Sequence, residues 1–390
     1  MEAPVGEFNL SRLERVISGP GKIDALGNEL ERRDLHRALV VTGKTLGSSP
    51  LLAKVTSSLG PRLAGVFTGA RQHVPLSSVR ALLAEVERVN ADCLISFGGG
   101  SPIDLTKVAT YVVLTGKEPI PARASTSGVG VVTREIVHLA VPTTLSAGEY
   151  THVAGVTDES TLVKEGVGDP RILPRTVIND PMLARDTPDW LWVATGMRAL
   201  DHAVESIYST RHHVMSDTLA SKAIQLLDAH LAPSIRTKGT EQLAHRGFCQ
   251  MAAWFSIFGA LNTGFGLSHA LGHQIGPRWN VPHGVTSCIT LPHVMRFMAE
   301  MAPQRFGPIA AGYGIAFDAA NPKPAALACA ERTAKFIAQF EVPHTLKNAG
   351  VPKNEVGEIA GTIEHHFGRM QVVERPVTRA EILALLEASY

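Results

Sequence analysis

The chain has 390 residues, with 37 Lys or Arg against 36 Asp or Glu, which gives a formal net charge of +1. This balance gives no electrostatic reason to expect nucleic acid or an anionic membrane surface as a partner. The hydrophobic share of 45% and the charged share of 19% are typical of a globular protein with a large core, and they exclude a mainly disordered chain.

The sequence also gives no sign of export, membrane insertion or cross-linking. No run of about 18 apolar residues predicts a membrane span, and the N-terminus lacks the apolar core of a secretory signal. The cysteines Cys93, Cys249, Cys288 and Cys329 form no CxxC pair, so neither a disulfide framework nor a zinc–thiolate site is indicated. We therefore expect a cytoplasmic protein with two or three domains.

Short apolar runs alternate with helix-type stretches through the first 180 residues. Four continuous apolar runs predict strands: 38–42, 63–67, 92–97 and 138–142. Three stretches predict helices: 50–58, 77–89 and 103–115. Strands that are apolar on both faces and separated by helices predict a parallel sheet covered on both sides. Residues 116–133, with several Gly, Pro and Ser, predict a loop or a hairpin excursion.

From about Pro181 the pattern becomes helical, with few strand candidates. Four long segments carry this periodicity: 190–210, 216–234, 240–261 and 325–340. We therefore predict an α/β, Rossmann-like domain with a parallel sheet over residues 1–180, followed by an all-helical domain over residues 181–390.

A glycine-rich loop follows the third predicted strand and opens a predicted helix. Its residues are Gly98, Gly99, Gly100 and Ser101. Glycines let the backbone turn sharply and approach a ligand, and a helix N-terminus offers unpaired N–H groups that suit a phosphate. Ser101 either caps the helix or donates a hydrogen bond to the same phosphate. The context favours pyrophosphate binding, although Gly-rich turns are common in other roles.

The ends of two other predicted strands are candidate positions for binding a nucleotide. Thr143 and Thr144 follow the fourth predicted strand, where ligands of open α/β sheets bind, although both residues could simply cap the turn. Gly43 ends the first predicted strand, where a carboxylate would grip an adenosine ribose and repel a 2′-phosphate. Because no carboxylate is present there, the sequence permits NADP as well as NAD.

Histidines gather in the second half of the chain. Arg198, His202 and Glu205 have helical spacing on one face, and His269 and His273 are again four residues apart. His283 follows a proline in a predicted turn. Two helical histidines and a third on a loop are typical of a metal or catalytic site. No Gly-x-Ser-x-Gly elbow, Walker loop or His-Glu-x-x-His motif occurs, so hydrolase chemistry lacks support.

These residues together resemble the iron-containing (group III) alcohol dehydrogenase superfamily over nearly the whole chain. The resemblance is carried by residues 19–22, 98–101 with Asp104 and Lys107, 142–144, 180–181, 195–205 and 269–293. It implies a dinucleotide-binding α/β domain and a helical domain, with the active site in the cleft between them. It also implies a set of cofactor-binding positions: Gly43, Gly98, Gly99, Gly100, Ser101, Asp104, Thr143, Thr144, Leu145 and Lys164.

Metal-dependent members of this family bind Fe or Zn through one Asp and three His. The resemblance puts those histidines at His202, His269 and His283, but Arg198 holds the aspartate position. A guanidinium does not ligate a cation and would repel it, and Asp201 is a poor substitute because it lies about 300° around the helix. We therefore predict a site without metal, with a weaker three-histidine site for Fe or Zn as the competing hypothesis.

The maleylacetate reductase branch resembles this chain more closely, because its members also replace that Asp, usually with Asn. The loop at residues 142–149 has that branch's spacing, although Arg198 and the order Ser-Ala-Gly depart from its usual pattern. We expect Arg198 and protonated histidines to stabilise the developing alkoxide, with His273 as proton donor. Alternatively, Arg198 clamps a substrate carboxylate or only forms an ion pair with Asp201 or Glu205.

Three functional hypotheses follow. The first is a metal-independent NAD(P)H-dependent reductase of a carboxylated ketone such as maleylacetate, with catalytic residues Arg198, His202, His269, His273 and His283. The second is a metal-dependent (Fe or Zn) alcohol dehydrogenase, and the third is a dehydroquinate synthase-like lyase or a non-redox protein on the same scaffold. The expected partners are a small carbonyl or alcohol substrate and further copies of this chain in a homodimer or larger homo-oligomer, with no nucleic acid and no membrane.

Overall fold

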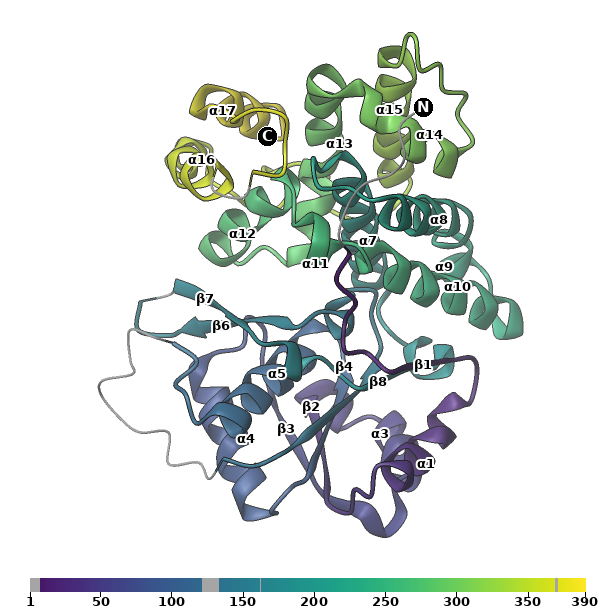
Figure 1. Cartoon of the computed structure of the whole chain (residues 1–390), viewed down its shortest axis with the longest axis vertical. Helices are drawn as coiled ribbons and strands as arrows, with labels where there is room; N and C mark the ends of the chain where they lie inside the picture. The colour runs from purple at the N-terminus through teal and green to yellow at the C-terminus, as the bar shows by residue number, and fades with distance from the viewer. Residues whose placement is uncertain (1–7, 121–132, 162, 369–370) are drawn as a thin grey trace. The chain divides into compact units, whose positions relative to one another are not determined.

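A computed structural model describes residues 8–120, 133–161, 163–368 and 371–390. The chain forms two compact units, one of residues Leu10–Asp186 and one of residues Thr187–Tyr390 together with Phe8 and Asn9 (Figure 1). Most of the predicted loop at 116–133 lies outside the described residues. Within the described ranges, no helix is both long enough and apolar enough to span a membrane.

The first unit is built on a six-stranded sheet in which every pairing is parallel. Its order is β1-β8-β5-β4-β2-β3, with bounds β1 (Arg15–Ser18), β2 (Ala38–Gly43), β3 (Leu63–Ala70), β4 (Cys93–Gly98), β5 (Val137–Pro142) and β8 (Thr176–Asn179). The four predicted strands are confirmed as β2, β3, β4 and β5. The edge strand β1 and its neighbour β8 escaped prediction because each has only four residues, too few for a pattern to stand out.

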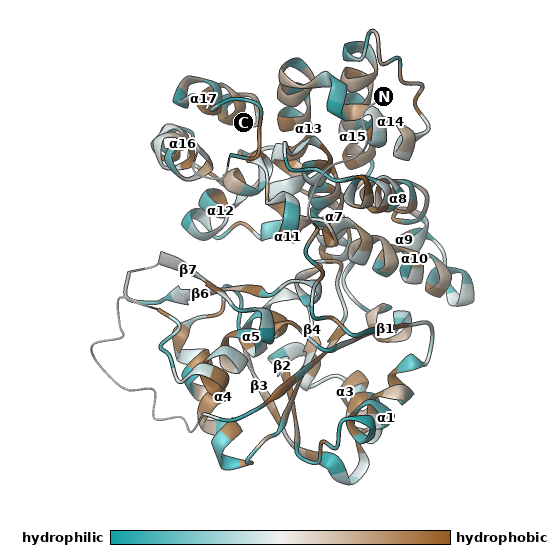
Figure 2. Ribbon diagram, in the orientation of Figure 1, coloured by the Kyte–Doolittle hydropathy of each residue, from teal (hydrophilic) through white to brown (hydrophobic). Residues whose placement is uncertain are grey.

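Helices cover both faces of this sheet, because successive side chains of a strand point to opposite faces. Leu39 and Val41 pack with α4 (Leu76–Arg88) and α5 (Gly100–Thr115) in one buried cluster. Val40 packs with α1 (Leu26–Arg32) and α3 (Pro50–Ser57) in the other. Figure 2 shows brown, hydrophobic segments within this sheet. The predicted Rossmann-like, doubly covered parallel sheet is confirmed.

The order of the strands reverses next to β2. From β2 the chain goes to β3 on one side, and β4 then pairs with β2 on the other side. In open α/β sheets, ligands bind at the carboxyl ends of the strands that flank such a reversal. Here those ends are Gly43 and Gly98.

A smaller antiparallel hairpin of β6 (Val153–Asp158) and β7 (Val163–Gly168) also belongs to this unit. The sequence pattern did not reveal it, because each strand mixes polar residues and glycines with few apolar ones. Two further helices are short: α2 (Lys44–Gly47) and α6 (Pro181–Ala184).

The second unit contains helices and no strand among its described residues. The helices are α7 (Asp189–Tyr208), α8 (Val214–His230), α9 (Pro233–Arg236), α10 (Gly239–Ile257), α11 (Ala260–Thr263), α12 (Leu267–Trp279), α13 (His283–Met301), α14 (Gly307–Tyr313), α15 (Lys323–Ala338), α16 (Ala360–Gly368) and α17 (Arg379–Ala388). The predicted helix at 216–234 divides into α8 and α9. His283 is not in a turn as predicted, because α13 begins at that residue, directly after Pro282.

Helix α7 forms the centre of this unit. It packs against α8, α10, α12 and α13, and all of its residues from Trp192 to Tyr208 are buried. A helix that is buried on every side is normally apolar all round. Three charged residues and one histidine of α7 are nevertheless buried, so each requires partners from the helices around it: Arg198, Asp201, Glu205 and His202.

Candidate active site

The glycine loop forms a cradle at the carboxyl end of β4. Gly98 has φ +140°, a conformation that favours glycine, and Gly99 is the residue before the first turn of α5. A Cβ atom on Gly99 would lie 2.9 Å from Cγ2 of Thr144, so a larger side chain would crowd the loop. The first N–H groups of the 16-residue helix α5 have no intrahelical partner and point out of its N-terminus. This cradle fits the pyrophosphate of a dinucleotide.

The loop after β5 lies beside this cradle. Gly98 pairs in register with Pro142, and the Thr143 N–H donates to the Gly98 carbonyl at 2.9 Å. Thr143 and Thr144 are buried here, and Ser101 is half-buried at the start of α5. The structure thus brings together the glycine loop and both threonines.

Three other residues were predicted to bind the cofactor: Leu145, Asp104 and Lys164. The Leu145 side chain is fully buried in the core, which leaves its backbone as the part able to meet a ligand. The Asp104 carboxylate lies 3.9 Å from Lys107 Nζ on α5, so it faces that ammonium group. Lys164 lies on β7, and its side chain is outside the described part of the structure.

Lys107 is fully buried and ties the segment after β5 to α5. Its ammonium group donates to the carbonyl of Gly148, to Thr151 Oγ1 at 3.0 Å and to the Val153 carbonyl at 2.8 Å. Burial lowers the pKa of Lys107 to about 8, against the opposing effect of Asp104. Lys107 was part of the family pattern, but no signal in the sequence indicated that it holds this loop.

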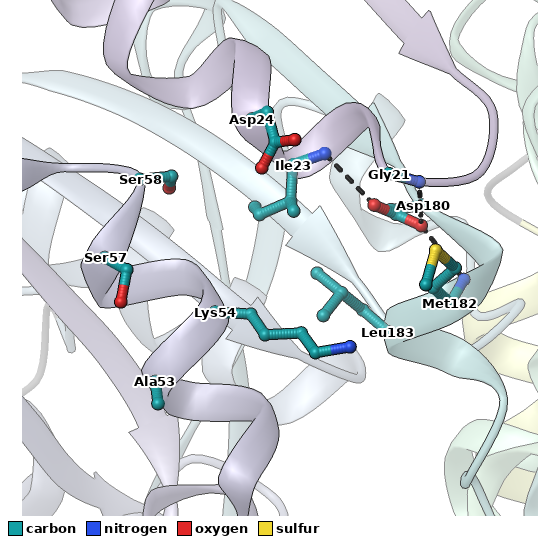
Figure 3. Close-up of a pocket in the computed structure, with 10 residues that line it drawn as sticks. All are labelled: Gly21, Ile23, Asp24, Ala53, Lys54, Ser57, Ser58, Asp180, Met182 and Leu183. Carbon is teal, nitrogen blue, oxygen red and sulfur yellow. Dashed lines mark hydrogen bonds between the residues drawn. The ribbon is translucent and has the colours of Figure 1, made fainter.

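Another part of the family pattern, residues 19–22 with Asp180, has a structural role. The buried Asp180 carboxylate accepts hydrogen bonds from the N–H groups of Gly21 at 3.1 Å, Ile23 at 3.0 Å and Met182 at 2.9 Å. Figure 3 shows these bonds at one side of a cavity of about 500 Å³, with Lys54 of α3 opposite. The carboxylate therefore joins the turn after β1 to α6.

In the helical unit, the Arg198 guanidinium reaches three helices. Its Nη1 donates to Asp201 Oδ2 at 3.0 Å and to Ser287 Oγ at 3.0 Å. Its Nη2 contacts His269 Nδ1 and lies 2.6 Å from His283 Nε2. Arg198 is only 3% exposed. The predicted ion pair with Asp201 is confirmed, and it coexists with contacts to two histidines.

Serines that the sequence reasoning missed complete this network. Ser268 and Ser287 donate to Asp201 Oδ2 at 2.8 and 2.6 Å, while Oδ1 accepts no hydrogen bond from the described residues. Burial raises the pKa of Asp201, and the Arg198 charge opposes that shift. These serines come from α12 and α13, so no spacing along α7 could have indicated them.

Glu205 connects α7 to the start of α12. Its carboxylate accepts from the N–H groups of Gly266 and His269, both at 2.9 Å, and Tyr208 Oη accepts from the N–H of Leu267 at 3.0 Å. These bonds satisfy N–H groups that a helix N-terminus leaves unpaired. Burial, together with the charge of Asp201, raises the pKa of Glu205 to about 8.

Three of the predicted histidines form one cluster. Ring nitrogens of His269, His273 and His283 lie within 4.8 Å of one another. His273 is exposed, and its ring centroid lies 4.6 Å from that of His269 and 5.1 Å from that of His283. The His269 ring also stacks on Phe265 at 4.1 Å, a neighbour that the sequence did not suggest.

His202 lies beside this cluster, not within it. Its ring centroid is 5.6 Å from that of His269, and its Nδ1 has no hydrogen-bond partner among the described residues. Burial and then the charge of Arg198 hold the pKa values of His202 and His269 well below their usual range. Both rings are therefore neutral at neutral pH, and the expectation of protonated histidines is wrong for these two.

Two family models match this chain and together cover most of it. The model described as iron-containing alcohol dehydrogenase matches residues 14–181, and the model of the C-terminal part of the Fe-containing alcohol dehydrogenase family matches residues 192–390. The chain belongs to the iron-containing alcohol dehydrogenase family. It is therefore an oxidoreductase that acts on alcohols or carbonyls, like the relatives named next.

Similar proteins of this family include enzymes with two different substrates in their names. The chain is 31% identical to a maleylacetate reductase of Burkholderia cepacia over 97% of this chain and 96% of that protein. It is also 31% identical to a lactaldehyde reductase of Escherichia coli over 88% of this chain and 89% of that protein. The solved iron-containing alcohol dehydrogenase of Corynebacterium glutamicum superposes with a TM-score of 0.82 at 26% identity, covering 99% and 97% of the two chains.

Members of the iron-containing alcohol dehydrogenase family usually hold a metal ion, so the histidine cluster must be tested for one. A neutral imidazole offers a single ring lone pair to a metal ion, and the Arg198 guanidinium already faces that lone pair at His269 Nδ1 and at His283 Nε2. A metal ion would also stand beside a permanent positive charge. The residues present therefore do not fit a metal.

Proposed function

We propose that this member of the family is an NAD(P)H-dependent reductase of a carboxylated ketone, such as maleylacetate, and that it works without a metal. The observation that carries this proposal is the guanidinium of Arg198 between His269 and His283, where its permanent charge takes the part that a metal cation plays in the metal-dependent members of the family. The near full-length similarity to a maleylacetate reductase supports the substrate class.

The cradle on the α/β unit would bind the cofactor. The N–H groups at the start of α5 would hold its pyrophosphate, with Ser101 as a hydroxyl donor, while Thr143 and Thr144 lie beside them. The reduced nicotinamide, when bound, supplies the hydride. Because Gly43 ends β2 without a carboxylate and Lys44 follows it, a 2′-phosphate meets no repulsion there, and we propose that NADPH is accepted as well as NADH.

The histidine cluster would stabilise the substrate oxygen and deliver its proton. As the hydride reaches the carbonyl carbon, negative charge develops on the oxygen, and the nearby Arg198 cation stabilises it. A proton from His273, the exposed ring of the cluster, completes the hydroxyl group. The sum is one carbonyl, one reduced cofactor and one proton converted to one alcohol and one oxidised cofactor.

A direct contact between Arg198 and the substrate has no support in the geometry. Four donor contacts already occupy the Nη1 and Nη2 groups: Asp201, Ser287, His269 and His283. Each terminal nitrogen carries two hydrogens, so these contacts use all four of them. We therefore propose an electrostatic role for Arg198 and not a clamp on the substrate carboxylate.

The test is the oxidation of NADH and NADPH with maleylacetate, using protein stripped by a strong chelator. Turnover that persists after stripping supports the metal-free reductase. Turnover that returns only with Fe or Zn, and with a simple aldehyde, contradicts it. The same preparation, run on a sizing column with light scattering, measures whether the chain is a homodimer or a larger homo-oligomer.

A metal-dependent alcohol dehydrogenase is the second candidate. One observation favours the metal: three histidine nitrogens lie within 4.8 Å of one another. The match to a lactaldehyde reductase, at the same 31% identity as the maleylacetate reductase, supports a simple aldehyde as the substrate of this candidate. The relatives named above are oxidoreductases, which favours either candidate over a lyase or a non-redox protein.

A further inference from the structure

The contacts of Arg198 determine which nitrogen of each neighbouring histidine carries the proton. A guanidinium has only donors and stays protonated in proteins. The nitrogens that it faces, His269 Nδ1 and His283 Nε2, must therefore be acceptors. A neutral imidazole carries one proton, so the proton of His269 is on Nε2 and that of His283 is on Nδ1.

The guanidinium is held so that it cannot turn away from these rings. Its other terminal nitrogen is anchored to Asp201, which is 0% exposed, and to Ser287. Asp201 in turn accepts from Ser268 and Ser287. The anchor thus draws on α7, α12 and α13, the same helices that carry the histidines.

We propose that Arg198 is a positioning residue that fixes opposite tautomers in His269 and His283 and so presents Nε2–H of the first ring and Nδ1–H of the second as hydrogen-bond donors. Both N–H groups lie on the sides of the rings away from the guanidinium. The use of these donors to hold the carbonyl oxygen of the substrate rests on the proposed function. The assignment of the two tautomers does not rest on the proposed function.

The first experiment reads the tautomers in the unaltered protein. Histidine side chains are labelled with ¹⁵N, and long-range ¹H–¹⁵N correlations are recorded at neutral pH, because protonated and bare ring nitrogens have different shifts. Spectra of His269→Gln and His283→Gln assign the two rings. We expect a protonated Nε2 in His269 and a protonated Nδ1 in His283. The same tautomer in both rings, or a doubly protonated ring, would overturn the proposal.

The second experiment removes the guanidinium. In Arg198→Met, the two rings lose their fixed donor, so we expect mixed tautomers and a fall in kcat of about 100-fold or more, the usual effect of losing a preorganised oxyanion donor. Added guanidinium ion should restore part of the fixed tautomer populations and part of kcat, and methylammonium should restore neither. Arg198→Lys should stay impaired, since one ammonium group cannot replace the planar fork. Unchanged tautomers in folded Arg198→Met would contradict the proposal.

A matched control separates this role from a loss of packing. Arg246 on α10 is equally buried, and its guanidinium lies 4.4 Å from the Trp192 ring centroid. Arg246→Met should lower Tm but leave the tautomers of His269 and His283 as in the unaltered protein. If the proteins turn over no carbonyl substrate, the tautomer spectra still decide this inference, while the proposed function alone fails.

Discussion

Arg198 and Asp201 form a buried ion pair one turn apart on α7, with Nη1 3.0 Å from Oδ2 and side chains only 3% and 0% exposed. Removing two charges from water is costly, and only good geometry with further hydrogen bonds compensates for it. Here Ser268 and Ser287 supply those bonds. The pair is therefore better explained by the charge that it keeps among the histidines than by a contribution to stability.

We predict that Asp201→Asn strongly destabilises the protein, because the Arg198 charge would stay buried without a counter-charge. The expected loss in the free energy of unfolding is about 3 kcal/mol or more, the usual cost of breaking a buried pair. Urea denaturation followed by circular dichroism measures it. The control is Asp228→Asn, which breaks a pair with Arg332 whose side chain is 48% exposed, and which should cost about 1 kcal/mol or less. Equal effects of the two variants would contradict the prediction.

We predict that His273→Gln abolishes proton delivery and leaves cofactor binding intact. The fall in kcat should be about 100-fold or more, as is typical for a general acid, while the Kd of the reduced cofactor, measured by its fluorescence, should not change. His36→Gln, an exposed histidine of the α/β unit, is the control and should keep the kcat of the unaltered protein. A His273→Gln enzyme with nearly full turnover would assign the proton to another group.

The sequence predicted most strands of the sheet but few of the hydrogen bonds between the site residues. The strands β2, β4 and β5 were recognised because burial on both faces makes them continuously apolar, and the glycine loop because it follows β4 directly. Periodicity did not indicate the histidine partners of Arg198, because His269 and His283 lie 71 and 85 residues further along the chain, and only the family resemblance put them in one site with Arg198. Periodicity reports which residues share a face of one helix, but not which helices pack together.

The protonation state of His202 and His269 was predicted wrongly for a related reason. The spacing of His202 and Arg198 indicated one shared face, and that is what the structure has, but it gave no measure of burial. Burial disfavours the charged form of an imidazole, and a neighbouring guanidinium disfavours it further. Only the packing around α7 supplies that information.

We predict that Glu149→Gln makes the protein more stable near pH 8 than the unaltered chain. The Glu149 side chain is 1% exposed, and its Oε2 lacks a hydrogen-bond partner among the described residues. Burial raises its pKa from 4.5 to about 7, against the opposing charge of Lys107. The folded state therefore holds this proton more tightly, so stability is greatest below about pH 4.5 and falls as the pH rises to about 7.

Glutamine carries no such proton, so the difference between the two proteins should grow across this window, to at most about 3 kcal/mol. Thermal and urea unfolding at pH 5, 6, 7 and 8 measures it. The titration of Lys107 affects the measured stability only at the alkaline end of this pH range, because burial lowers the pKa of Lys107 to about 8. A constant difference between pH 5 and 8 would show that Glu149 does not titrate in this range.

At the end of β2, we predict that Gly43→Asp shifts the cofactor preference toward NADH. Gly43 has φ −89° and ψ 166°, which any residue adopts, so an aspartate fits the backbone without strain. Its carboxylate would accept a hydrogen bond from the ribose and repel a 2′-phosphate. The ratio of kcat/KM for NADPH to that for NADH should fall about tenfold or more, since 1.4 kcal/mol of repulsion is a factor of ten.

Gly43→Ala is the matched control for this change. In both variants, the new Cβ lies 3.3 Å from the carbonyl oxygen of Ala70, so crowding against β3 is the same and only the charge differs. The alanine enzyme should lose activity with both cofactors in equal proportion and keep the ratio of the unaltered protein. If alanine shifts the ratio as much as aspartate does, the effect is steric. If neither variant shifts it, the adenosine ribose does not lie at the end of β2, and the cradle at Gly98 and Gly99 must then hold the dinucleotide in another orientation.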